Sequence, residues 1–216
     1  MFECDVRMTA DNVLVLSHNT SITGTVDGVS ETLTIAQSTY DDLSRLVLTP
    51  NTKYGDVKIP KLADVLKFAR HYDMKATLDL KDISDACVEA VVSLVKLYNM
   101  SKNILYFTGD NPTVVFKKVI DLDEQSTVVF YYSDDMSYID DITQDPSRVV
   151  ISVVNWEENK DAAVAAIRNK GYGLYFYAVN NAGNAALKYL PDYIEYQTGV
   201  NVTDIMNTYF GQVKFW

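Results

Sequence analysis

The amino-acid sequence of 216 residues predicts an α/β fold in which helices cover a mainly parallel β-sheet. From residue 75 onward, short β-branched and aromatic runs alternate with stretches of helical periodicity. These runs are apolar along most of their length, as in strands that helices bury on both faces, whereas a one-sided antiparallel sheet alternates polar and apolar residues. The apolar fraction of 48% supplies a full core, and the length suits one large domain.

The chain opens on an apolar run that predicts a β-strand with Glu3 and Asp5 on the same face. Thr9–Asn12 then predicts a turn, and Val13–Leu16 predicts a second strand. Four residues are too few for a parallel crossover, so we expect an antiparallel hairpin. With the turn centred in the middle of Thr9–Asn12, equal counting outward brings His18 opposite Glu3.

Residues 19–58 are rich in serine, threonine and glycine, and we expect a small excursion above the main body, with a weak helical pattern at 41–47. Ile59 and Pro60 then predict the start of a helix at 61–70. The strands that follow are expected at 75–81, 104–108, 127–132, 148–154, 173–179 and 193–197. Further helices are expected at 85–98, 112–120, 160–170, 182–190 and 202–210, with a short acidic segment at 138–142.

The number of strands limits the architecture. The first strand and the six later ones make seven parallel strands, with the return arm of the hairpin outside the count. A (β/α)₈ barrel needs eight strands. An open doubly wound sheet of seven also accounts for the alternation, and periodicity alone leaves both architectures open.

The charge and the apolar pattern exclude some function classes. Lysine and arginine total 19 against 29 acids, a net charge of −10 without a basic cluster, so nucleic acid and anionic membranes are poor partners. No apolar run approaches the roughly 20 residues of a membrane span. Cys4 and Cys87 suit buried thiols better than a disulfide framework or a zinc site. We expect a soluble chain, either cytoplasmic or secreted.

Two carboxylates on one strand face repel each other, and a divalent cation would make this arrangement tolerable. The alternative for Glu3 and Asp5 is a strand whose acidic face is solvated. The apolar flanks, together with a hairpin that returns His18 to the pair, favour a metal site.

The segment Phe2–His18 resembles the glycerophosphodiester phosphodiesterase family, whose members carry Glu-x-Asp-Val, then Thr-x-Asp, then a histidine that ends the hairpin. Further matches are Ile59-Pro60-x-Leu62-x-x-Val65-Leu66, Leu78-Asp-Leu-Lys81 in place of the family's Glu-x-Lys, and Tyr175-Phe-Tyr-Ala-Val-Asn180 in place of its Trp-Thr-Val-Asn.

The resemblance implies a TIM (β/α)₈-type barrel that hydrolyses glycerophosphodiesters, small molecules of lipid metabolism, to glycerol 3-phosphate and an alcohol. It assigns Glu3, Asp5 and Asp79 as ligands of a divalent metal, Ca²⁺ or Mg²⁺, and His18 as a catalytic histidine. Lys81 falls on the same face as Asp79 and would contact the phosphate. For Asp79 the alternative is an inward carboxylate that pairs with Lys81 and binds no metal. Tyr177 takes the place of a tryptophan that lines the pocket mouth.

The sequence departs from the family pattern at three places. The family's first strand carries His-Arg-Gly, with a second catalytic histidine, and this sequence has no such motif. We therefore expect a single barrel domain over residues 1–216 that lacks its first strand, with the excursion at about 19–58. Asp79 replaces a glutamate, and Tyr196–Gly199 replaces the usual Thr-Asp.

Two main functions follow from this pattern. The first is a metal-dependent phosphodiesterase, and the alternative is a non-catalytic relative that binds a phosphorylated ligand or a protein partner. A sugar isomerase or aldolase has only the general fold in its favour. A barrel that lacks a strand has two open edges, at the Glu3 strand and the Tyr193 strand, so we expect either a homodimer or coverage of the gap by residues 211–216.

Overall fold

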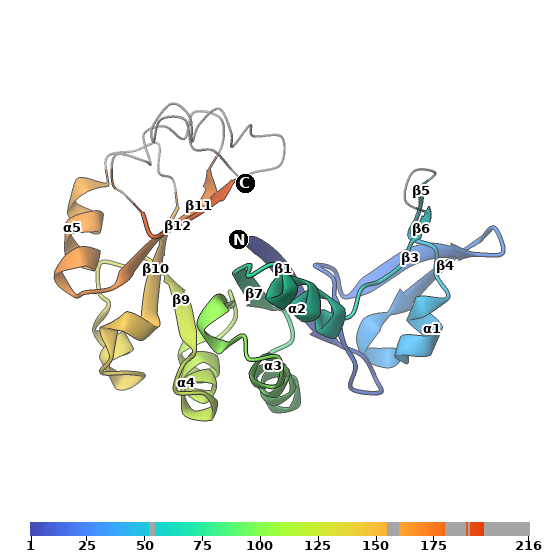
Figure 1. Ribbon diagram of the computed structural model, residues 1–216, viewed down its shortest axis with the longest axis horizontal. Coiled ribbons are helices and arrows are strands. Elements are labelled where there is room, and N and C mark those ends of the chain that lie inside the picture. The colour runs from blue at the N-terminus through green and yellow to red at the C-terminus, as the bar shows by residue number, and fades with distance from the viewer. Residues whose placement is uncertain (52–54, 155–159, 180–188, 190, 197–216) are drawn as a thin grey trace. The chain divides into compact units, whose positions relative to one another are not determined.

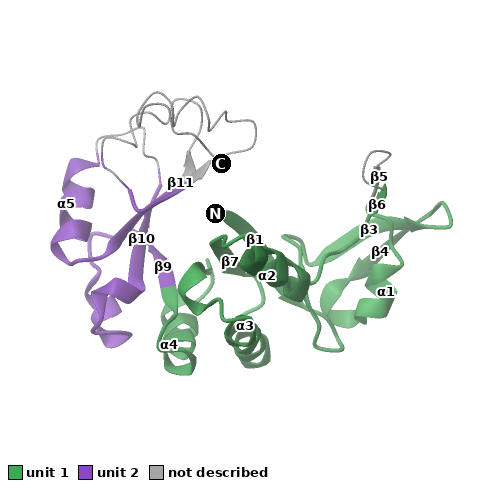
Figure 2. Cartoon of the chain, viewed as in Figure 1, with its two compact units in different colours: residues 1–127 green, residues 128–216 purple. Residues whose placement is uncertain are grey.

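The computed structural model of the chain describes residues 1–51, 55–154, 160–179, 189 and 191–196. It divides into two compact units, residues 1–127 and 128–216, which Figure 2 distinguishes by colour. The strands are β1 (Phe2–Met8), β2 (Leu14–Leu16), β3 (Ser21–Val26), β4 (Val29–Thr34), β5 (Thr49–Asn51), β6 (Gly55–Val57), β7 (Ala76–Leu80), β8 (Ile104–Phe107), β9 (Thr127–Tyr131), β10 (Val149–Val153), β11 (Gly173–Val179) and β12 (Tyr193–Tyr196). The helices are α1 (Tyr40–Ser44), α2 (Leu62–His71), α3 (Asp85–Leu97), α4 (Pro112–Leu122) and α5 (Asp161–Asn169), and the short 3₁₀ helices are η1 (Ile35–Gln37), η2 (Ser101–Asn103), η3 (Ser137–Asp141) and η4 (Pro146–Arg148).

The main sheet of the first unit runs in the order β2-β1-β7-β8 (Figure 1). Strand β7 pairs in parallel with β1 and β8, while β2 is antiparallel to β1. All five residues of β7 are buried, as expected for a central strand of a parallel sheet that is packed on both faces. Helices α2, α3 and α4 each place buried apolar residues against the sheet, as their periodicity predicts.

The hairpin of β1 and β2 forms as expected, but the expected register is wrong by one residue. Val6 pairs with Leu16, which takes His18 away from the position opposite Glu3. The cause is a turn of three residues rather than an even number: the Thr9 amide donates to the Val13 carbonyl at 3.0 Å. Asn12 closes this turn in the left-handed region, with φ of 61°.

The segment 19–58 forms a small body around the hairpin β3–β4 and helix α1 (Figure 1). Its core gathers Ile22, Ile35, Leu43 and Leu46, and Val15 of the β1–β2 hairpin belongs to the same cluster. The excursion is therefore anchored by apolar packing directly beside the hairpin that carries His18. The assignment of one domain over residues 1–216 stays a prediction.

The second unit contains a parallel sheet in the order β9-β10-β11-β12, with helix α5 between β10 and β11. The described residues thus hold seven strands in parallel pairs and one antiparallel arm, β2, as the alternation predicts. The expected acidic segment is the 3₁₀ helix η3. The helices expected at 182–190 and 202–210, and the tail at 211–216, lie outside the described residues, apart from the turn residue Tyr189.

None of the helices in the described parts of the chain is long and apolar enough to cross a lipid bilayer.

Both cysteines are free and buried, as the sequence predicts. Burial is the main cause that raises the pKa of Cys4 and of Cys87 to about 12, and neighbouring carboxylates raise each pKa further.

At pH 8 only about one such thiol in ten thousand is ionised. We therefore expect Ellman's reagent to leave both thiols of the native chain unmodified and to react with both when the chain is unfolded in urea. Rapid labelling of the native chain would contradict the burial.

Candidate functional site

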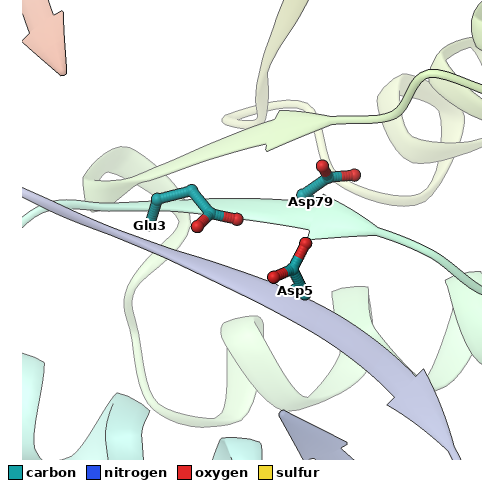
Figure 3. Close-up of side chains that lie close together, drawn as sticks. All are labelled: Glu3, Asp5 and Asp79. Carbon is teal, nitrogen blue, oxygen red and sulfur yellow. The ribbon is translucent and has the colours of Figure 1, made fainter. Parts of the chain in front are cut away.

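Three carboxylates meet where β1 and β7 pair. The parallel register sets Asp5 beside Asp79, and strand alternation places Glu3 on the same face as Asp5. Figure 3 shows the three side chains gathered from these two strands. Each offers one oxygen atom, and these atoms all lie within 4.8 Å of one another. The structure therefore brings together the three acidic residues that the sequence suggests as metal ligands.

The three carboxylates differ in exposure along the cluster. Glu3 is exposed, Asp5 is half-buried and Asp79 is only 7% exposed. Oδ1 of Asp79 is buried without a hydrogen-bond partner among the described residues. Burial raises the pKa of Asp79, although the neighbouring Lys81 opposes this shift. A buried carboxylate oxygen that lacks a donor, in a set of three carboxylates, fits a hard divalent cation.

Lys81 lies directly after β7 and contacts the carboxylates. Its Nζ lies 2.7 Å from Oδ2 of Asp79 and 3.3 Å from Oδ1 of Asp5. Burial disfavours the charged ammonium, but the hydrogen bonds and charges of the two aspartates outweigh burial and raise the pKa of Lys81. The ammonium therefore stays protonated and compensates part of the negative charge of the cluster.

His18 follows β2 and is exposed. Its Nδ1 lies 3.2 Å from Oδ1 of Asn19. The hairpin places His18 just beyond the strand that pairs with β1, although not opposite Glu3 as the sequence suggests.

Arg7 is a site residue that the sequence reasoning missed. Its Nη1 donates to the carbonyl of Lys81 at 3.3 Å, and its Nη2 donates to the carbonyl of His18 at 2.8 Å. One guanidinium therefore ties together the two segments that carry Lys81 and His18. The signal was available in the alternation of β1, where Arg7 follows Glu3 and Asp5 at intervals of two residues.

A hollow of about 450 Å³ lies beside Arg7 and Lys81, on the side of the small body. Arg7 and Lys81 line it together with Ile35 of η1 and Ile83 and Ser84, which precede α3. A second hollow, of about 630 Å³, lies at the amino ends of β8 and β9, away from the carboxylates. Tyr177 belongs to β11, and its side chain lies outside the described part of the structure.

Comparison with known proteins identifies the family. A family model described as the glycerophosphoryl diester phosphodiesterase family matches residues 1–206. A glycerophosphoryl diester phosphodiesterase from Parabacteroides distasonis superposes with a TM-score of 0.72 at 16% identity, over 96% of this chain and 75% of that one. A phosphodiesterase from Oleispira antarctica, in complex with the product sn-glycerol-3-phosphate, gives a TM-score of 0.71 at 14% identity, over 95% and 84%. A glycerophosphodiester phosphodiesterase from Agrobacterium tumefaciens gives 0.66 at 18% identity, over 90% and 83%.

These likenesses show the fold, an α/β fold of the TIM-barrel type, and confirm the fold class that the resemblance implies. No curated protein sequence matches the chain. Because the family model covers nearly the whole chain, from the acidic strand β1 to beyond β12, the chain belongs to the glycerophosphoryl diester phosphodiesterase family.

Proposed function

We propose that this chain is a metal-dependent phosphodiesterase that cleaves glycerophosphodiesters to glycerol 3-phosphate and an alcohol. The observation that carries the proposal is the cluster of Glu3, Asp5 and Asp79, with its buried and unpartnered oxygen beside the Lys81 ammonium. The cluster lies on two neighbouring parallel strands, and Lys81 and His18 follow the ends of β7 and β2. Active sites of α/β barrels form at the carboxyl ends of the strands. The Oleispira structure, which holds glycerol 3-phosphate, supports the product assignment.

The three carboxylates would hold a divalent cation. Oxygen ligands of this kind favour Ca²⁺ or Mg²⁺ over zinc. When bound, the cation would supply charge stabilisation to the phosphoryl oxygens of the substrate. Glu3 would offer the accessible ligand and Asp79 the buried one.

The chain's own residues would perform binding and proton transfer. Lys81 would bind a phosphoryl oxygen, because its ammonium lies beside the cluster on a flexible stem. His18, exposed at the hairpin end, would protonate the leaving alkoxide. Arg7 would hold both groups in place through their backbone carbonyls. Tyr177 is proposed to contact the substrate on the family resemblance alone.

The second candidate function is a non-catalytic relative that binds a phosphorylated ligand or a protein partner. The sequence contains two histidines, His18 and His71. His71 ends α2, where it is exposed and contacts the ring of Tyr72 with ring centroids 4.6 Å apart. Of the two histidines, His18 follows the strand that pairs with β1, so it would serve one proton-transfer role and a different group would serve the other.

Hydrolysis of glycerophosphocholine and of bis(p-nitrophenyl) phosphate, with Ca²⁺ or Mg²⁺ and with a chelator, tests the enzyme. We expect turnover that requires the metal. His18→Ala should lower kcat by about 10²- to 10⁴-fold because it removes the proton donor. His71→Ala is the matched control, because it removes an exposed imidazole outside the cluster, and we expect it to leave kcat unchanged.

The possible results separate the two candidate functions. Equal loss of activity in both histidine variants would contradict the role of His18. No turnover, with calorimetric binding of glycerol 3-phosphate that Asp79→Asn removes, would favour the binding protein. If the chain shows neither turnover nor binding of glycerol 3-phosphate, both candidate functions are contradicted.

We also propose a homodimer that covers the open strand edges. Among the described residues, β2 pairs with β1 from Val6 onward, so the amino-terminal half of β1 has a strand partner only on its β7 side. Among the described residues, β12 is the last strand of its sheet, and coverage of this edge by residues 211–216 is the alternative to a dimer. Unpaired edges of this kind favour association with another chain. Light scattering over a range of concentrations should give a mass of about twice 24.3 kDa, and the monomer mass throughout would contradict the dimer.

A further inference from the structure

Lys81 bridges the two carboxylates that lie deepest in the cluster. Its ammonium contacts Oδ2 of Asp79 at 2.7 Å and Oδ1 of Asp5 at 3.3 Å. The same two residues each supply an oxygen atom to the group of three carboxylates that would hold a cation. An ammonium and a divalent cation would therefore compete for the same two carboxylates.

We propose that Lys81 is a displaceable counter-cation, whose ammonium compensates Asp5 and Asp79 in the metal-free protein and is released toward the phosphate-bearing ligand when a divalent cation binds. This inference rests on the proposed metal-dependent function. It assigns to one side chain two opposite effects: Lys81 weakens the binding of the metal and strengthens the binding of the anion.

The charges of the cluster support the exchange. Asp5 and Asp79 together carry two negative charges, and the Lys81 ammonium, with one positive charge, offsets only part of this charge. A divalent cation compensates more of it than Lys81 does, and it repels the ammonium when both lie within a few ångströms. The buried Oδ1 of Asp79 has no hydrogen-bond partner among the described residues, so this oxygen is an acceptor that Lys81 does not pair.

The surroundings of Lys81 leave room for the released ammonium. The side chain is partly exposed, at 26%, and Lys81 lines the hollow of about 450 Å³ together with Arg7. Four rotatable carbon–carbon bonds allow the ammonium to leave the carboxylates without movement of the backbone. The backbone of Lys81 meanwhile stays anchored, because its amide donates to the Val6 carbonyl and its carbonyl accepts from Arg7.

Lys118 offers a matched control within the same unit. Its ammonium also bridges two carboxylates, at 2.7 Å from Asp85 and 2.8 Å from Glu89, and its side chain is 22% exposed. Among the described residues this pair does not belong to a group of three carboxylates. Lys118→Met therefore removes a comparable ion pair at a place where we expect no metal.

Calorimetric titration of the wild type, Lys81→Met and Lys118→Met with CaCl₂ and with MgCl₂ measures the first effect. We expect Lys81→Met to bind the metal about tenfold more tightly than the wild type, within the usual range of coupling between two sites, and Lys118→Met to match the wild type. Titration of the metal-saturated proteins with sn-glycerol 3-phosphate measures the second effect. Here we expect about tenfold weaker binding by Lys81→Met alone.

The opposite signs of the two effects distinguish this role from that of a fixed structural ion pair. Unchanged or weaker metal binding by Lys81→Met would overturn the proposal, while activity of the wild type would still support the proposed function. Absence of metal binding in all three proteins would overturn both.

A second measurement follows the Lys81 ammonium directly in the wild-type chain, so the charge of the cluster stays unchanged. NMR of the lysine ammonium groups, with Lys81→Arg used for assignment, should show a shift of the Lys81 signal on addition of Ca²⁺ while the Lys118 signal stays in place. A Lys81 signal that does not respond to bound Ca²⁺ would overturn the displacement.

Discussion

The parallel pairing of β1 with β7 is the contact on which the candidate site depends. Its register sets Asp5 beside Asp79 on one face, while Val6 and Leu80 pair on the opposite, apolar face. Val6 is fully buried and Leu80 nearly so, and a shift of one residue would expose such side chains to the charged face. The hydrophobic core under the helices therefore fixes the register that the carboxylates need. The pairing of β1 with β7 therefore determines both the packing of the core and the geometry of the site.

Negative charge is the second constraint on this face of the sheet. Asp79 is buried among apolar strands, where a carboxylate is costly unless a cation compensates it. Lys81 supplies part of that compensation, and Arg7 orders the backbone around it. The paired strands hold the carboxylates in place, so on the proposed function the Lys81 side chain is the group that would have to move when a cation binds.

Much of this structure could be predicted from the sequence, because it follows from local periodicity. Alternation along β1 and β7 places the carboxylates and Lys81 on one face, and the strand and helix boundaries agree within a few residues. The hairpin register could not be predicted, since it depends on the left-handed conformation of Asn12. Alternation along β1 places Arg7 on the face of Glu3 and Asp5, but its two hydrogen bonds could not be predicted, because the acceptors are the backbone carbonyls of residues distant in sequence.

Binding and proton transfer depend on different parts of this site. The acidic cluster is built into two paired strands, and its Asp79 is buried there, so replacing Asp79 disturbs the packing of the sheet. His18 instead lies on an exposed segment, which Arg7 holds through a backbone carbonyl, so its imidazole can change without cost to the core. On the proposed function, the sheet would keep the carboxylates in place for a cation regardless of the proton-transfer groups. Cleavage of the phosphodiester would then depend on exposed residues such as His18, which can vary while the sheet is retained.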